Sequence, residues 1–137
     1  MTVTAGTPIE LVEGVYATLP GRVAAGRERF GRPLTLAEKV IASHLDQKLK
    51  DVAIERGKTT LYLRPDRVAM QDATAQMALL QFAQADIPKV AVPTTVHCDH
   101  LIRAHEGAGP DTLRALDENA EVYEFLRSAS NRYGIGF

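Results

Sequence analysis

The sequence has a single cysteine, Cys98, among its 137 residues, so the chain cannot form an internal disulfide bond. One thiol is typical of proteins from a reducing compartment. No uninterrupted apolar run approaches the roughly 18 residues that a membrane-spanning helix needs, which argues against a membrane protein. The formal net charge is only -1 and basic residues are scattered among acidic ones, so the basic patch of a nucleic-acid-binding module is missing.

The start of the chain carries no recognisable targeting signal. Residues 1–6 lack both the Arg-rich character of a transit peptide and the apolar core of a signal peptide. This favours a cytoplasmic location, with the mitochondrial matrix as the alternative for a processed product. With 45% hydrophobic and 24% charged residues, the composition is that of a globular chain, and we expect residues 1–137 to form one unit.

Two helical segments are predicted in the first third of the chain. Residues 8–29 should form one or two helical stretches, interrupted at residues 20–21, where proline is followed by glycine. Thr35 and Glu38 have the spacing of a capping box, which predicts a helix that begins there and runs to about residue 45.

The middle of the chain alternates between strand and helix patterns. Residues 59–64 alternate as a strand does, residues 68–70 form a short apolar run, and residues 89–96 predict a strand buried on both faces, although Pro93 weakens it. Asp72 is placed to cap the helix between the last two runs. That helix is expected to present Ala73, Met77 and Leu80 on its apolar face, with Leu79 and Phe82 alongside. The alternation predicts an α/β layered unit with a largely parallel sheet.

A glycine-rich loop at residues 106–110 precedes the last helical pattern of the sequence. The periodicity predicts one long helix from about Asp111 to Arg132. Its broad apolar face is expected to comprise Leu113, Leu116, Ala120, Tyr123 and Leu126.

Polar residues close the two apolar runs in the middle of the chain. Gln71 ends the first run, and Asp99 and His100 follow the second. In open α/β sheets chemistry collects at the carboxyl ends of strands, so these residues are candidates for a site. A carboxylate beside an imidazole can fix its tautomer and keep a proton available near neutral pH. An ordinary loop pair and a polar strand-helix junction are the alternatives.

A zinc site is a competing interpretation of the same region. His97, Cys98, His100 and His105 are all possible ligands, but they lack paired ligand spacing and lie on one short segment. The spacing therefore argues against zinc.

Three segments, residues 64–77, 88–93 and 97–102, carry a family resemblance, and flanking segments at residues 32–39, 55–59 and 119–126 agree with it. With these segments the chain resembles the amino-terminal part of the aconitase (aconitate hydratase) family, of the mitochondrial-type class.

The resemblance implies that Gln71 binds substrate and that His100, supported by Asp99, protonates the departing hydroxyl group of citrate or isocitrate. It also implies a [4Fe-4S] cluster held by three cysteines of the remaining polypeptide, so Cys98 is not expected to be a cluster ligand. The expected reaction is the interconversion of citrate and isocitrate through cis-aconitate. The chain alone is then expected to be inactive and without a cluster, as a fragment or a truncated gene product.

Two other functions remain open: a non-catalytic binding or assembly module, and one chain of a split hydro-lyase. A segment of a larger enzyme should also expose apolar faces, so self-association of the isolated chain is possible.

Overall fold

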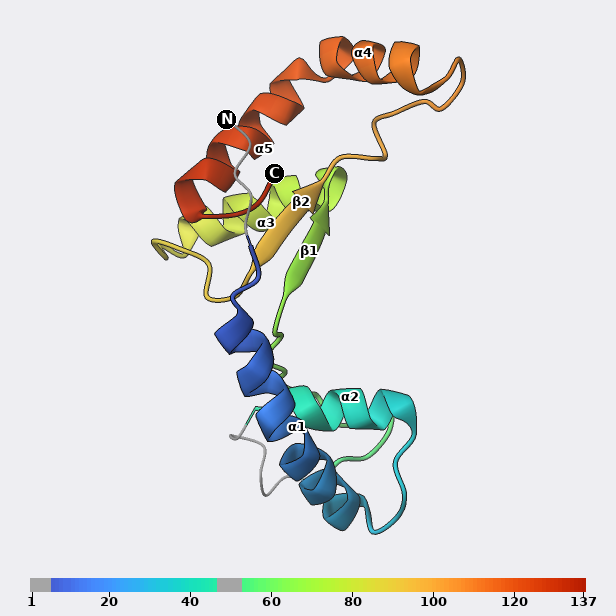
Figure 1. Cartoon of the computed structure of the whole chain (residues 1–137), viewed down its shortest axis with the longest axis vertical. Helices are drawn as coiled ribbons and strands as arrows, with labels where there is room; N and C mark the ends of the chain where they lie inside the picture. The colour runs from blue at the N-terminus through green and yellow to red at the C-terminus, as the bar shows by residue number, and fades with distance from the viewer. Residues whose placement is uncertain (1–5, 47–52) are drawn as a thin grey trace. The chain divides into compact units, whose positions relative to one another are not determined.

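The computed structural model describes residues 6–46 and 53–137, which cluster into two compact units (Figure 1). Residues 7–66 make up the helical unit, and residues 67–137, together with Gly6, make up the α/β unit. The predicted strand-helix-strand segment lies within the α/β unit. The expectation that the whole of residues 1–137 behaves as one unit stays a prediction. No helix among the described residues is both long and apolar enough to cross a membrane.

Helix α1 (Ile9–Phe30) forms one continuous helix, so the predicted interruption at residues 20–21 is wrong. Pro20 lies inside α1, where it removes one backbone hydrogen bond. The position is exposed, so water can hydrate the carbonyl group that loses its partner. The helix ends at Gly31, whose positive φ of 63° allows its N–H group to bond to the Glu28 carbonyl oxygen at 3.2 Å.

Helix α2 (Leu36–His44) begins with the predicted capping box. The Glu38 N–H group donates to Thr35 Oγ1 at 3.3 Å, and the Thr35 N–H group donates to Glu38 Oε2 at 2.9 Å. Arg32 adds a bidentate contact to the same carboxylate. The predicted helix and its end near residue 45 are confirmed.

The predicted strand at residues 59–64 is wrong. Only Leu63 makes a bridge, antiparallel to Leu45. The Asp46 N–H group donates to the Tyr62 carbonyl oxygen at 2.9 Å, and the Arg64 N–H group donates to the His44 carbonyl oxygen at 2.7 Å. The partner of this segment is the end of a helix, which offers too few extended residues for a ladder.

The α/β unit contains two parallel strands that pair directly, and one helix lies between them in the sequence (Figure 1). This confirms the predicted α/β class. Strand β1 (Val68–Gln71) leads into helix α3 (Asp72–Gln84), and strand β2 (Thr94–His97) pairs with β1. The strand predicted at residues 89–96 is therefore too long at its start. The observed strand begins after Pro93, which has no N–H group to donate to a ladder. The Pro93 carbonyl oxygen still accepts from the Val68 N–H group at 3.0 Å.

Burial in β2 alternates, so the prediction of a strand buried on both faces is wrong. Thr94 and Val96 are buried, whereas Thr95 is half-buried. On the other side of β2, Gly136 exchanges hydrogen bonds with it: the Val96 N–H group donates to the Gly136 carbonyl oxygen at 2.8 Å, and the Gly136 N–H group donates to the Thr94 carbonyl oxygen at 2.9 Å. The end of the chain thus continues the sheet.

The long helix predicted from Asp111 to Arg132 is two helices, α4 (Ala108–Glu118) and α5 (Ala120–Tyr133). They meet at Asn119, which leaves the helical conformation at φ -120° and ψ 24°. The Asn119 side chain donates to the Ala115 carbonyl oxygen at 3.1 Å, a contact with which asparagine competes with regular helix. The predicted apolar face divides accordingly: Leu116 is exposed, whereas Leu126 is completely buried.

The core of the α/β unit joins α3, β2, α5 and the end of the chain. Its fully buried members are Ala75, Leu79, Val96, Leu126 and Ile135. The face predicted for α3 is wrong, because Met77 and Leu80 are exposed. Asp72 takes the position on the buried face in their place, one turn before Ala75.

We expect Gly26→Ala to destabilise the helical unit. A Cβ atom at Gly26 would lie 2.8 Å from Ala42 Cβ and 3.1 Å from Leu34 Cδ1, so α1 and α2 would have to separate. Overpacking of this kind typically costs about 1 to 3 kcal/mol. The free energy of unfolding, measured by urea titration with circular dichroism, tests the expectation.

Gly14→Ala is the matched control, since it lies in the same helix with nothing within 4 Å of the new Cβ atom. That variant should gain about 0.5 to 1 kcal/mol, because alanine is the better helix former. Equal effects of the two variants would show that the helices do not approach each other closely at Gly26.

Candidate functional site

The parallel pairing of β1 with β2 brings the predicted site residues to one edge of the sheet. Gln71 and His97 are partners in the register, each at the carboxyl end of its strand. Asp99 and His100 follow His97 within three residues. The Gln71 side chain is exposed and makes no capping hydrogen bond to α3. Its amide group therefore does not stabilise the start of that helix.

Asp99 and His100, adjacent in the sequence, contact each other through their side chains. His100 Nδ1 lies 2.9 Å from Asp99 Oδ1, and the two side chains are 50% and 71% exposed. An ionised carboxylate can only accept a hydrogen bond. His100 therefore carries a hydrogen atom on Nδ1, and Nε2 is the ring atom that can exchange a proton with a ligand.

Asp72 is the site residue that sequence reasoning missed. Its side chain is completely buried, Oδ2 accepts from the His100 N–H group at 3.2 Å, and Oδ1 lies 3.5 Å from His100 Nδ1. We expected a helix cap here, but Gln71 occupies the N-cap position and Asp72 is the first residue of α3. Two polar residues in a row at the end of a short apolar run were the available signal, since only one of them can be the cap.

The candidate zinc ligands are not assembled. Among the described residues, the group of three or more possible ligands whose donor atoms all lie within 4.8 Å of one another is Asp72, Asp99 and His100. His97 Nε2 instead lies 2.9 Å from Thr95 Oγ1, in its own strand. The region is an acid-base cluster rather than a histidine-cysteine metal site.

The environment of Cys98 keeps its thiol protonated. Burial, followed by the negative charges of Asp72 and Asp99, raises the pKa of Cys98 to about 11. Metal ligation and nucleophilic attack both need the thiolate. Cys98 is therefore neither a nucleophile nor a ready ligand at neutral pH.

A second buried carboxylate, Asp111, anchors the loop that follows the Asp99–His100 pair, here called the dyad. Its Oδ2 accepts from the N–H groups of His105, Glu106 and Gly107 at 2.7, 2.9 and 2.9 Å. These bonds, that from Gly107 foremost, hold the pKa of Asp111 below its usual range. The loop is thus fixed to α4, in which Asp111 lies one turn beyond the start.

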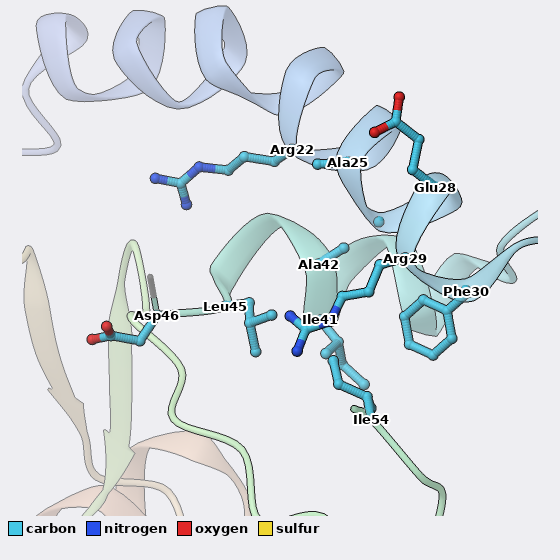
Figure 2. Close-up of a pocket in the computed structure, with 11 residues that line it drawn as sticks. Arg22, Ala25, Glu28, Arg29, Phe30, Ile41, Ala42, Leu45, Asp46 and Ile54 are labelled. Carbon is cyan, nitrogen blue, oxygen red and sulfur yellow. The ribbon is translucent and has the colours of Figure 1, made fainter. Parts of the chain in front are cut away.

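Both units also contain open cavities. One in the α/β unit has a volume of about 490 Å³ and borders the loop after β2 at Cys98, with Tyr123 and Phe137 among its lining residues. One in the helical unit has a volume of about 420 Å³ and lies between α1 and α2. Figure 2 shows Arg22 and Arg29 of α1 beside it, and no predicted site residue lines it. The dyad is therefore adjacent to the first cavity only.

Comparisons with a family model and with individual proteins point to the same family. Residues 38–137 match the model of the Aconitase family (aconitate hydratase). The chain is 56% identical over 122 residues to the probable mitochondrial aconitate hydratase of Caenorhabditis elegans, covering 89% of this chain and 16% of that protein. It is 62% identical over 111 residues to the mitochondrial aconitate hydratase of Aspergillus fumigatus, and this match covers 81% of this chain and 14% of that protein. The chain thus spans about one sixth of the length of these relatives.

We expect Cys98 to be alkylated by iodoacetamide much more slowly in the folded chain than in the unfolded chain at neutral pH. With a pKa of about 11, the thiolate fraction is on the order of a hundredfold below that of a free thiol. Mass spectrometry of the alkylated fraction over time, with and without denaturant, measures the ratio. Asp72→Asn should speed the reaction, because it removes a charge that disfavours the thiolate. Equal rates in the folded and unfolded chains would contradict the assignment.

Asp111→Asn should destabilise the chain in a pH-dependent way. A carboxyl group whose pKa is lowered by folding stabilises the fold above its unfolded pKa, about 3.9, and loses this contribution as the pH falls through its folded pKa. The variant should therefore unfold at lower urea concentration than the unmodified chain at neutral pH, and the difference should shrink in acid. Asp117→Asn, at an exposed position of the same helix, is the control and should show no such trend.

Proposed function

The chain belongs to the aconitase family, and on that premise we propose that it is the amino-terminal segment of an aconitate hydratase. That enzyme interconverts citrate and isocitrate through cis-aconitate by dehydration and rehydration. The family model covers residues 38–137, which include the whole predicted site. The observation that carries the proposal is the 2.9 Å contact between His100 Nδ1 and Asp99 Oδ1, at the sheet edge where Gln71 also lies.

In the dehydration step His100 acts as a general acid. The C–O bond to the substrate hydroxyl group breaks, and the oxygen leaves as water when a proton reaches it from His100 Nε2. Asp99 accepts the hydrogen bond from Nδ1 and stabilises the imidazolium ion before the transfer. In rehydration the neutral imidazole takes the proton back from water. We assign the removal of the carbon-bound proton to a base of the remaining polypeptide.

Gln71 suits a binding role. Its amide can donate and accept hydrogen bonds, and it is exposed at the same sheet edge as the dyad. A tricarboxylate offers hydroxyl and carboxylate oxygens that such an amide can bind. We assign Gln71 to substrate binding rather than to proton transfer, because its amide does not titrate.

The residues of this chain do not fit the [4Fe-4S] cluster of the family. Such clusters are held by several cysteine thiolates, whereas this chain has one cysteine. That cysteine, Cys98, is held as a thiol by a pKa of about 11. The cluster ligands therefore belong to the remaining polypeptide of the enzyme, which is the partner this proposal requires.

The location of the chain also stays a prediction. The relatives from Caenorhabditis elegans and Aspergillus fumigatus are named as mitochondrial proteins. Their names support the mitochondrial alternative, and nothing in the comparisons supports the cytoplasmic one.

A chimeric enzyme tests the proposed function. In it this chain replaces the matching segment of the Aspergillus fumigatus aconitate hydratase, to which it is 62% identical over 111 residues. The chimera should turn over citrate. His100→Asn should lower kcat by about a hundredfold or more, the usual contribution of a positioned acid. His105→Asn replaces a neighbouring histidine outside the dyad and is the matched control.

Gln71→Ala should chiefly raise KM if its amide contacts the ground state and the transition state alike. Near-normal kinetics of both the His100→Asn and the Gln71→Ala chimeras would show that the site is assigned wrongly. An inactive chimera that folds and carries its cluster would count against the function itself.

A further inference from the structure

We propose that Asp72 is a positioning residue for His100. Its carboxylate accepts from the His100 N–H group at 3.2 Å through Oδ2, and Oδ1 lies 3.5 Å from His100 Nδ1. The same side chain thus fixes the backbone of residue 100 and faces its ring. Asp72 touches His100 and not the reacting atoms, so it acts through the histidine.

The two carboxylates that face His100 Nδ1 differ in burial. The Asp99 side chain is 71% exposed, whereas that of Asp72 is completely buried. Water screens an exposed carboxylate and competes for its hydrogen bonds, whereas a buried one acts in a lower dielectric. Asp99 makes the shorter contact with the ring, and Asp72 makes the contact that is shielded from water.

Asp72 is also held in place by its own element. Its Oδ1 accepts from the Ala73 N–H group at 2.7 Å, and Asp72 is the first residue of α3. The positive end of the helix dipole favours a negative charge at this position. The carboxylate is therefore oriented before any ligand binds, and it ties the start of α3 to the loop after β2.

This arrangement determines which ring nitrogen carries the proton. Ionised carboxylates only accept hydrogen bonds, so two of them at Nδ1 retain a hydrogen atom there. In the neutral imidazole the lone pair is then on Nε2, the atom that accepts and returns a proton during catalysis. Asp72 thus holds the position of His100 and acts together with Asp99 on its tautomer.

Nitrogen NMR of the labelled chain tests the tautomer directly, at a pH where the neutral imidazole dominates. The ring nitrogen shifts of His100 should show hydrogen on Nδ1 in the unmodified chain. Asp72→Asn keeps an oxygen that can accept the backbone N–H group but removes the charge at the ring. The fraction of the Nδ1–H form should then fall even though Asp99 is still present, while His44 and His105 stay unchanged. An unaltered His100 tautomer would overturn the proposal.

The backbone amide spectrum shows whether Asp72→Asn folds. If it does not, Asp99→Asn supplies the complementary measurement in a chain that retains Asp72. His100 should keep the Nδ1–H form as its main tautomer in that variant. Loss of this form would show that Asp99 alone orients the ring and would overturn the proposal. Asp117→Asn, at an exposed aspartate of α4, should leave His100 unchanged.

The catalytic consequence rests on the proposed function. In the active chimera Asp72→Asn should lower kcat by up to about a hundredfold with little change in KM, the effect of a misplaced catalytic group. A shifted tautomer with unchanged kcat would refute the catalytic role of Asp72. The NMR result needs no activity, so an inactive chimera would count against the proposed function alone.

Discussion

The parallel pairing of β1 with β2 is the constraint on which the candidate site depends. Parallel strands have their carboxyl ends at the same edge of a sheet. The observed register sets Gln71 opposite His97, so residues 26 positions apart in the sequence become neighbours. A shift by one residue would turn Gln71 to the other face of the sheet. The site is thus a property of the register as much as of the residue types.

A buried carboxylate sets the orientation of α3. Burying a charge is costly unless it is hydrogen-bonded, and Asp72 accepts from the N–H groups of Ala73 and His100. Because Asp72 faces inward, Ala75 and Leu79 face inward with it, and Met77 faces solvent. The contact that ties the helix to the dyad loop therefore also decides which residues of α3 enter the core.

The segment between β2 and α4 is held near both of its ends in the same way. Asp72 accepts the N–H group of His100, and Asp111 accepts three consecutive N–H groups from residues 105–107. A long connection without secondary structure is usually mobile, but these carboxylates supply the hydrogen bonds that a helix or strand would otherwise provide. Between the two anchors Ala104 adopts a positive φ of 52°, a conformation that alanine rarely adopts.

Local signals in the sequence were sufficient for the features that depend on neighbouring residues. The capping box at Thr35 and Glu38 and the strand-helix-strand order were predicted correctly, because each reflects short-range hydrogen bonding or apolar patterning. The family resemblance was confirmed as well. The roles of Gln71, Asp99 and His100 stay proposals.

The tertiary structure decided what depends on distant partners. Residues 59–64 alternate like a strand, but in the structure they form only a bridge with Leu45 at the end of α2. Apolar periodicity suggested one helix where Asn119 separates two. Asp72 looked like a cap, and its contact with His100, 28 residues away, could not be read from either segment. A side chain is buried only when something covers it, and the covering element is supplied by the fold.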